Sequence, residues 1–201
     1  MQSSPAMQSM LFDQAEKLGR KPYPILSSMP ERAVSDWHAY AYQEKATADV
    51  VFFDLPGTMN STGVISTLAA LDYLLVPMKA DRMVLESTLN FATTINDRLI
   101  ATHQANIKGL YLFWNMVDRR ERNRLFEIYE KGINQLGLQC LHTMIPMRSN
   151  FNKDLAVNGP IYRSTLFPPD RLFTKECGFD NLLDEVCILL KFPDHGQESN
   201  E

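Results

Sequence analysis

The sequence predicts an α/β protein with a mostly parallel sheet that helices cover on both faces. Four short, mainly apolar runs, at residues 50–53, 73–78, 109–115 and 138–146, alternate with segments whose apolar residues recur at helical spacing. Strands that are apolar on both faces are typical of parallel sheets buried between helices, and the alternation of strand and helix is what such sheets require.

The composition is that of a globular protein with a sizeable core. The chain has 201 residues, of which 45% are hydrophobic and 22% are charged, and its formal net charge is −4. This balance disfavours a protein whose whole surface binds nucleic acid, although it allows a local basic patch. We expect a single domain over residues 1–192 and a polar C-terminal tail over 193–201.

The cysteines and the hydropathy pattern predict a cytoplasmic protein. Cys140, Cys177 and Cys187 have no metal-ligand spacing and cannot all pair, so we expect reduced thiols. No apolar run approaches the roughly 18 residues of a membrane span, and the polar N-terminus does not resemble a signal peptide.

Two helices and a weak strand are expected in the first 46 residues. Apolar residues at helical spacing, with a proline near the start and a glycine after the end, predict a helix over 5–18. Residues 22–29 are a strand candidate that two prolines weaken. A second helix over 30–46 should bury three residues on one face, namely Val34, Trp37 and Ala41.

Three further helices are expected between and after the later strands. The helices over 83–103 and 120–136 each have one apolar face, made of Leu85, Leu89, Ala92, Ile95 and Leu99 in the first and of Leu125, Ile128, Ile133 and Leu136 in the second. Gly137 is the expected stop of the second helix. A closing helix over 179–190 is expected to be capped by Asp180.

A carboxylate stands at the end of the first predicted buried strand. Asp54 follows the apolar run directly, and Pro56, Gly57 and Thr58 come after it. In open α/β sheets, ligands bind at the carboxyl ends of the strands. There a carboxylate can act on Mg²⁺, and a glycine lets backbone N–H groups approach an anion. The alternative is that Asp54 only caps a turn.

Two later strands end in the same way. One of them ends in Asn115, with Asp118 three residues later, and the other ends in Pro146, Met147 and Arg148. A carboxamide places a donor and an acceptor side by side and can pair with an adenine edge, whereas the proline-to-arginine segment could wall a base or hold a phosphate. Each ending has a plain structural alternative, so the series of three is more informative than any one of them.

Four segments resemble the ParA/MinD partition ATPases in order and rough spacing: VVFFDLPGT, LDYLLVPMKAD, YLFWNMVDRR and TMIPMRSNFNKDLAVNGPIYRS. The resemblance covers about residues 48–190, and DLPGT with the following NSTG looks closest to ParA-like proteins of conjugative transposons. In this family the acidic strand end is the Walker B or switch II element, and the Asn strand is the adenine-recognition loop. The resemblance implies a P-loop NTPase type of fold that binds ATP and Mg²⁺.

The resemblance also implies roles for the matching residues. Asp54 would act on Mg²⁺ through a water molecule and Gly57 would sense the γ-phosphate, so these two would be catalytic. The cofactor-binding set would be Asp54, Pro56, Gly57, Thr58, Asn115, Asp118, Pro146, Met147 and Arg148.

The chain departs from this family at its start. The family opens with a strand and a lysine-rich P-loop, K-G-G-x-G-K-[ST], and this sequence contains no G-K-[ST]. It therefore looks like a ParA-type protein that lacks the P-loop strand and begins about a third of the way in. We expect this chain alone neither to hydrolyse ATP nor to bind ATP and Mg²⁺ appreciably. We also expect the edge of the 50–53 strand to pair with the first 48 residues or with a second copy.

The sequence has one dense basic patch, at the start of the helix predicted over 120–136. It contains Arg119, Arg120, Arg122 and Arg124, and positions 120 and 124 share a helix face. The plain interpretation is a solvated helix face. The functional one is contact with the phosphates of non-specific DNA, which ParA-like proteins use.

The leading hypothesis is a ParA/MinD-like homologue that works in segregation, maintenance or transfer of a mobile DNA element. Its expected partners are a second copy of the chain, non-specific DNA and a partition or transfer adaptor protein. The alternative is a non-catalytic module that binds protein or DNA on a decayed partition fold. A weaker third hypothesis is an unrelated small-molecule enzyme on a doubly wound sheet.

Overall fold

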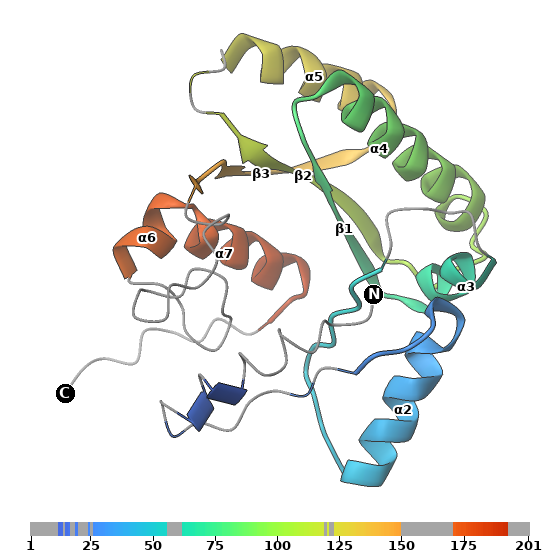
Figure 1. Cartoon of the computed structure of the whole chain (residues 1–201). Coiled ribbons are helices and arrows are strands. Elements are labelled where there is room, and N and C mark those ends of the chain that lie inside the picture. Colours follow the sequence, from blue (N-terminus) through green and yellow to red (C-terminus); the bar gives the residue numbers. More distant parts are fainter. Residues whose placement is uncertain are drawn as a thin grey trace. The chain divides into compact units, whose positions relative to one another are not determined.

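The structure is a computed structural model that describes residues 12–13, 15–16, 19, 24, 26–55, 62–118, 120, 123–149 and 171–192. Within them the chain is α/β, with a three-stranded parallel sheet in the order β1-β2-β3 (Figure 1). The strands are β1 (Tyr73–Met78), β2 (Gly109–Val117) and β3 (Gln139–Pro146). The α/β prediction and three of the four predicted strands are confirmed.

Helices occupy most of the described chain outside the sheet. They are η1 (Pro30–Arg32), α2 (Ala33–Glu44), α3 (Thr62–Ala70), α4 (Arg82–Ile95) with the π-helical turn η2 (Asn96–Ile100), α5 (Asn123–Gln135), α6 (Arg171–Glu176) and α7 (Phe179–Leu189). The predicted helices over 30–46, 83–103, 120–136 and 179–190 are confirmed to within a few residues, whereas α3 and α6 are additional. In the described part of the chain, no helix is both long and apolar enough to span a membrane.

The helix predicted over 5–18 falls mostly outside the described residues. Phe12, Asp13, Ala15 and Glu16 are helical, and Ala15 is buried. At the other end of the chain, α7 begins without the predicted side-chain cap. Its N-cap position is Gly178. Asp180 lies in the first turn instead, where its carboxylate interacts favourably with the positive end of the helix dipole.

The strand predicted over 50–53 is wrong. Residues 50–55 have no regular secondary structure, and the side chain of Phe52 is 79% exposed. The described part of the weaker candidate, 22–29, is not a strand either. An apolar run becomes a strand only where its backbone groups find a neighbouring strand, and the described sheet ends at β1. Because residues 50–53 do not form a strand, the pairing that we expected for the edge of that strand does not arise.

The elements group into two compact units. One contains η1, α2 and α3, the other contains β3, α5, α6 and α7, and the division passes through β1, α4 and β2. In the first unit the Thr67 hydroxyl donates to the Pro30 carbonyl. Gly63 lies so close to η1 that an added Cβ would be 2.7 Å from Cβ of Glu31. The single-domain prediction stays a prediction.

Helix α2 buries less than the sequence predicts. Val34, Trp37 and Ala41 are half-buried, and no residue of α2 is fully buried. The predicted face of the 83–103 helix is close to correct, since Leu85, Ala92, Ile95 and Leu99 are buried and Leu89 is half-buried. Asp81 caps this helix, because its Oδ1 accepts the N–H groups of the second and third helical residues, each at 3.1 Å.

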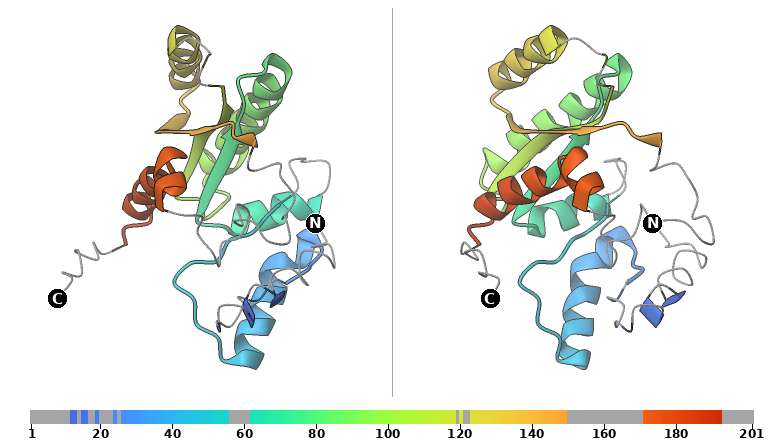
Figure 2. Two further views of the ribbon diagram at one scale, coloured as in Figure 1. Left: turned by 60° about the vertical axis from the view of Figure 1, so that its left-hand side comes forward. Right: turned by 90° about the vertical axis from the view of Figure 1, so that its left-hand side faces the viewer.

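The second unit has a layered arrangement, in which α5 lies on one side of β2 and β3 and α6 and α7 lie on the other (Figures 1 and 2). Trp114 of β2 is fully buried and meets the Phe126 ring edge to face, with centroids 4.9 Å apart. The indole N–H of Trp114 donates to Oε1 of Glu130 at 3.3 Å. Trp114 thus fixes which face of α5 is turned to the sheet.

The face of α5 that the sequence predicts to be buried is partly wrong. Ile128 is 57% exposed and Leu136 is 47% exposed, whereas Phe126 and Ile133 are buried. The buried stripe follows the residues that pack around Trp114, so the helix is rotated relative to the prediction. Gly137 ends the helix as predicted, with a φ of +70°.

Strand β3 bulges relative to β2. Leu112 is the Cα partner of Cys140, and Trp114 is the partner of Met144, so two steps along β2 (112 to 114) match four along β3 (140 to 144). Three residues of β3 (141–143) therefore lie opposite one residue of β2 (113), and a bulge of this kind leaves backbone groups that need other partners. Helix α7 provides one of these partners.

Candidate functional site

Two of the predicted strand endings lie side by side at one end of the sheet. Val117 of β2 is the Cα partner of Pro146 of β3, and the N–H of Met147 donates to the Val117 carbonyl at 2.8 Å. Because parallel strands bring their carboxyl ends to the same edge, the polar residues of the two endings are neighbours. We call the following residues the carboxyl edge: Asn115, Asp118, Pro146, Met147 and Arg148.

Strand β2 is irregular next to Asn115. Its Oδ1 accepts the N–H of Met116 at 2.9 Å, and Met116 has a φ of +56°, in the left-handed region that residues other than glycine seldom adopt. Outliers of this kind cluster at sites that position a ligand. This hydrogen bond to the next residue fixes the position of the Asn115 side-chain amide. The amide oxygen still has a second lone pair that can accept a hydrogen bond from another donor.

Asp118 and Arg120 form a bidentate ion pair at the surface. Nε of Arg120 donates to Oδ1 at 3.0 Å, Nη2 donates to Oδ2 at 2.6 Å, and the Arg120 backbone N–H also bonds Oδ1. These bonds lower the pKa of Asp118 to about 2 and raise the pKa of Arg120. One arginine of the predicted basic patch therefore already has a carboxylate partner, although its side chain is 89% exposed.

Arg148 connects the end of β3 to α6. Its Nη2 lies 3.2 Å from Oε2 of Glu176, and its Nε is buried and has no hydrogen-bond partner among the described residues. The neighbouring Met147 is 48% exposed, whereas Pro146 is buried. The carboxyl edge therefore presents an apolar side chain next to a guanidinium that is engaged by a carboxylate.

The remaining predicted site residues are not brought to this edge by the described structure. Asp54 is exposed in the segment without regular structure, so the prediction that it ends a strand is wrong. Pro56, Gly57 and Thr58, like Arg119 and Arg122, lie outside the described residues. The fourth arginine of the patch, Arg124, belongs to α5. No group of three or more potential metal-binding His, Cys, Asp or Glu side chains occurs in the described segments.

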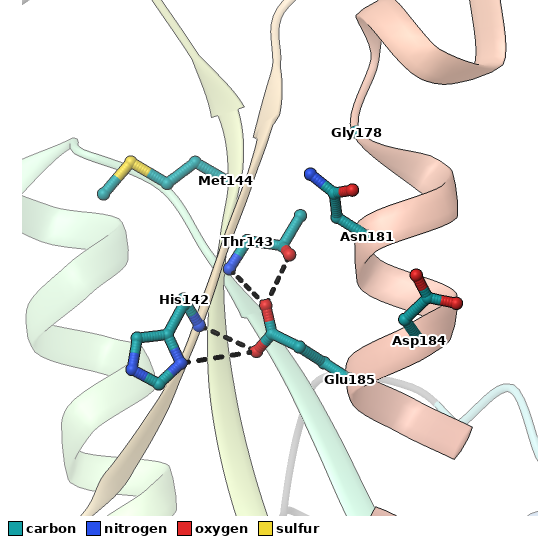
Figure 3. Close-up of a pocket in the computed structure, with 7 residues that line it drawn as sticks. All are labelled: His142, Thr143, Met144, Gly178, Asn181, Asp184 and Glu185. Carbon is teal, nitrogen blue, oxygen red and sulfur yellow. Dashed lines mark hydrogen bonds and ion pairs between the residues drawn. The ribbon is translucent and has the colours of Figure 1, made fainter. Parts of the chain in front are cut away.

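A hollow between β3 and α7 was not predicted from the sequence. It has a volume of about 490 Å³ and is lined by His142, Thr143, Met144, Gly178, Asn181, Asp184 and Glu185 (Figure 3). Gly178 has a φ of +71°, and a Cβ there would lie 3.4 Å from Cγ2 of Thr143. The glycine thus allows α7 to begin close to the strand.

The Glu185 carboxylate binds the bulge of β3 at this hollow (Figure 3). It accepts the backbone N–H groups of His142 at 2.8 Å and Thr143 at 2.7 Å, together with the Thr143 hydroxyl. Burial raises the pKa of Glu185, but the Thr143 hydroxyl and the two N–H groups outweigh it, so the net shift is downward. Successive N–H groups that point the same way bind anions. Here the anion belongs to the chain itself, and nothing in the sequence marks Glu185 for this role.

Cys140, Cys177 and Cys187 are free thiols. Cys177 is fully buried, and burial of the Cys140 thiol, followed by the nearby carboxylates of Glu130 and Glu185, raises its pKa to about 12. A thiol with such a pKa stays protonated at neutral pH and is a poor nucleophile. Cys140 is therefore a poor candidate for a catalytic nucleophile.

The carboxyl edge offers the groups that a planar, polar ligand requires. Asn115 supplies a carboxamide, Met147 an exposed apolar surface and Arg148 a guanidinium, all on adjacent strand ends. No model of a known protein family, no curated protein and no solved structure matches the chain, so its function is inferred from these residues and from the motif resemblance.

Proposed function

We propose that the chain is a homologue of the ParA/MinD partition ATPases that acts in the segregation, maintenance or transfer of a mobile DNA element. The observation that carries the proposal is the adjacency of Asn115 and Asp118 with the segment from Pro146 to Arg148 at the ends of two parallel strands. In the family that the motifs resemble, the corresponding segments hold adenine. Their adjacency supports that role, because one base can contact both segments only if they are neighbours.

The residues present fit the base of ATP better than its phosphates. The Asn115 amide can donate to a ring nitrogen of adenine and accept from its amino group, and Met147 can pack on the ring. For Mg²⁺ and the phosphates, the described residues give no such support, because Asp54 is exposed and outside any strand. Bound ATP and Mg²⁺ would supply phosphoryl-transfer chemistry, but no hydrolytic step follows from the described residues.

A non-catalytic interaction module is the second candidate. The absence of a strand at 50–55 favours it, because the predicted magnesium-side carboxylate then has no fixed place at a sheet edge. In this case the partners would be DNA or an adaptor protein, and no nucleotide would be needed. The two candidates differ in whether adenine binds at all.

We expect adenine nucleotides to bind weakly, with a Kd of about 1 mM, or about −4 kcal/mol. AMP and ATP·Mg²⁺ should bind within about threefold of each other, because the contacts would be made to the base and not to a phosphate cradle. An NMR titration of the chain with AMP, ATP·Mg²⁺ and GTP measures this. Asn115→Ala should weaken binding about tenfold or more, because it removes the paired donor and acceptor.

The matched control is Asn134→Ala, which removes an exposed amide from α5 and should leave the titration unchanged. Micromolar affinity for ATP together with weak affinity for AMP would contradict binding through the adenine base alone. Absence of any adenine preference over guanine would leave the interaction module as the remaining candidate.

Duplex binding by the basic patch should be limited by Asp118. Because this carboxylate already neutralises Arg120, Asp118→Asn should strengthen binding and steepen the dependence of log K on log salt by about 0.9, one phosphate contact. Arg120→Ala should flatten that slope by less than this amount. Fluorescence anisotropy with a labelled duplex at several salt concentrations measures both.

Asp180→Asn is the control for this experiment, since it removes the same charge from an exposed position on α7. If Asp180→Asn strengthens duplex binding as much as Asp118→Asn does, the effect is due to net charge and not to the release of Arg120. If neither Asp118→Asn nor Arg120→Ala changes the slope, the patch is a solvated helix face.

A further inference from the structure

In the part of the chain that the structure describes, strand β1 has a strand neighbour on one side only, namely β2, and we call its other side the open edge. The Lys108 N–H donates to the Asp72 carbonyl at 2.6 Å, so the backbone groups of Asp72 face β2. Because these groups alternate in direction along a strand, those of Tyr73 and Leu75 point away from β2.

Pro77 supports the same assignment independently. Proline has no N–H group, and within sheets it occurs on edge strands, where the missing donor would have faced away from the neighbour. Pro77 is two residues after Leu75, so it falls on the outward-facing side, and its side chain is exposed. The outward donors of β1 are therefore restricted to the stretch before Pro77.

The run Val50–Phe53 is a strand-forming segment without a strand. It consists only of β-branched and aromatic residues, which favour strands, and carboxylates precede and follow it at Asp49 and Asp54. Phe52 is 79% exposed, and the run takes no part in the sheet of its own chain. Its four residues match the four of β1 that precede Pro77.

We propose that Val50–Phe53 of a second copy of this chain pairs with the open edge of β1. The chain carries both halves of the contact: an edge of β1 with no strand neighbour among the described residues, and an apolar run that is not part of the described sheet. Two copies can exchange these halves about a twofold axis, which closes the assembly at a dimer. The contact is short, so the dimer should be weak, with a Kd on the order of 10 μM. It requires no nucleotide and is independent of the proposed function.

Sedimentation equilibrium between about 1 and 200 μM tests the dimer directly. Phe52→Asp should raise the dimer Kd about 100-fold or more, because it places a charge in the paired run. Tyr42→Asp is the matched control: it introduces the same charge in place of an aromatic residue that is 88% exposed on α2, and it should leave the Kd unchanged. A monomer across the whole range, or equal effects of the two variants, would overturn the proposal.

Complementation between two defective variants distinguishes exchange from other dimers. Leu75→Pro removes an outward N–H of β1 and should abolish self-association, as Phe52→Asp does. A mixture of the two should associate measurably more than either alone, because the intact run of one variant can pair with the intact edge of the other. Energy transfer between labelled chains measures this, and no gain on mixing would contradict strand exchange. Should Leu75→Pro fail to fold, the comparison of Phe52→Asp with Tyr42→Asp still decides.

Discussion

Trp114→Ala is expected to lower the free energy of unfolding by about 3–5 kcal/mol, the usual cost of truncating a buried aromatic side chain. Trp114 is fully buried between β2 and α5, and its ring contacts Phe126 edge to face. The truncation would leave a cavity on this side of the sheet and would deprive half-buried Glu130 of its indole donor. Because domains are stable by only about 5–15 kcal/mol, the variant should be close to unfolding at 37 °C.

Urea denaturation followed by circular dichroism measures this change. Trp37→Ala is the matched control, since Trp37 is the other tryptophan of the chain and is only half-buried on α2. It should cost about 1 kcal/mol, because less apolar surface is lost. Trp114→Phe should fall between them, as it keeps a ring against Phe126 but loses the hydrogen bond. A cost for Trp114→Ala no larger than that for Trp37→Ala would refute the assignment of Trp114 as the core of this unit.

Local sequence patterns predicted a strand correctly wherever the apolar run also has a neighbouring strand to pair with. The runs at 73–78, 109–115 and 138–146 are mainly apolar, and in the structure each has a strand beside it. The run at 50–53 is apolar throughout but has no strand beside it in the described part of the chain, and it is not a strand itself. Strand formation depends on a partner that is distant in sequence, which residue composition does not reveal.

The carboxyl edge was predictable because topology alone creates it. Once strands are parallel, their carboxyl ends lie at one edge, so Asn115 and Pro146 become neighbours without any knowledge of side-chain contacts. The rotation of α5 was not predictable from apolar spacing, since Ile128 and Phe126 are equally plausible core residues until the position of Trp114 is known. The contact between Glu185 and His142 joins residues 43 positions apart and has no local signal.

Glu185→Ala is expected to lower the free energy of unfolding by about 2–3 kcal/mol. The change removes the acceptor of two backbone N–H groups and of the Thr143 hydroxyl, and bonds to a charged group are the stronger kind. The loss should not be larger, because the Glu185 side chain is 23% exposed and water can replace part of the lost bonding. For a chain of this size the melting temperature should fall by about 5–10 °C.

Two variants control for helix and charge effects at this position. Glu185→Gln keeps an acceptor oxygen of nearly the same shape and should cost about 1 kcal/mol. Asp184→Ala removes the preceding, exposed carboxylate of α7 and should change stability by less than about 0.5 kcal/mol. Thermal denaturation of the three variants tests the ranking. If Asp184→Ala costs as much as Glu185→Ala, the bonds to the bulge are not what stabilises this contact.

The contribution of Glu185 should also depend on pH, with a sign set by its lowered pKa. The folded state favours the carboxylate, so the stabilisation is fully present above the ordinary pKa of 4.5 and is lost as the pH falls through the lower folded value. The difference in unfolding free energy between the parent chain and Glu185→Gln should therefore be constant from about pH 8 to 5.5 and shrink below about pH 4.5. The measurement belongs in a His142→Ala background, because Nδ1 of His142 lies 3.7 Å from Oε2 of Glu185 and its removal leaves the carboxylate with only its bonds to the bulge. A difference that grows as the pH falls to 3 would mean that the protonated acid, and not the carboxylate, is what the bulge of β3 binds.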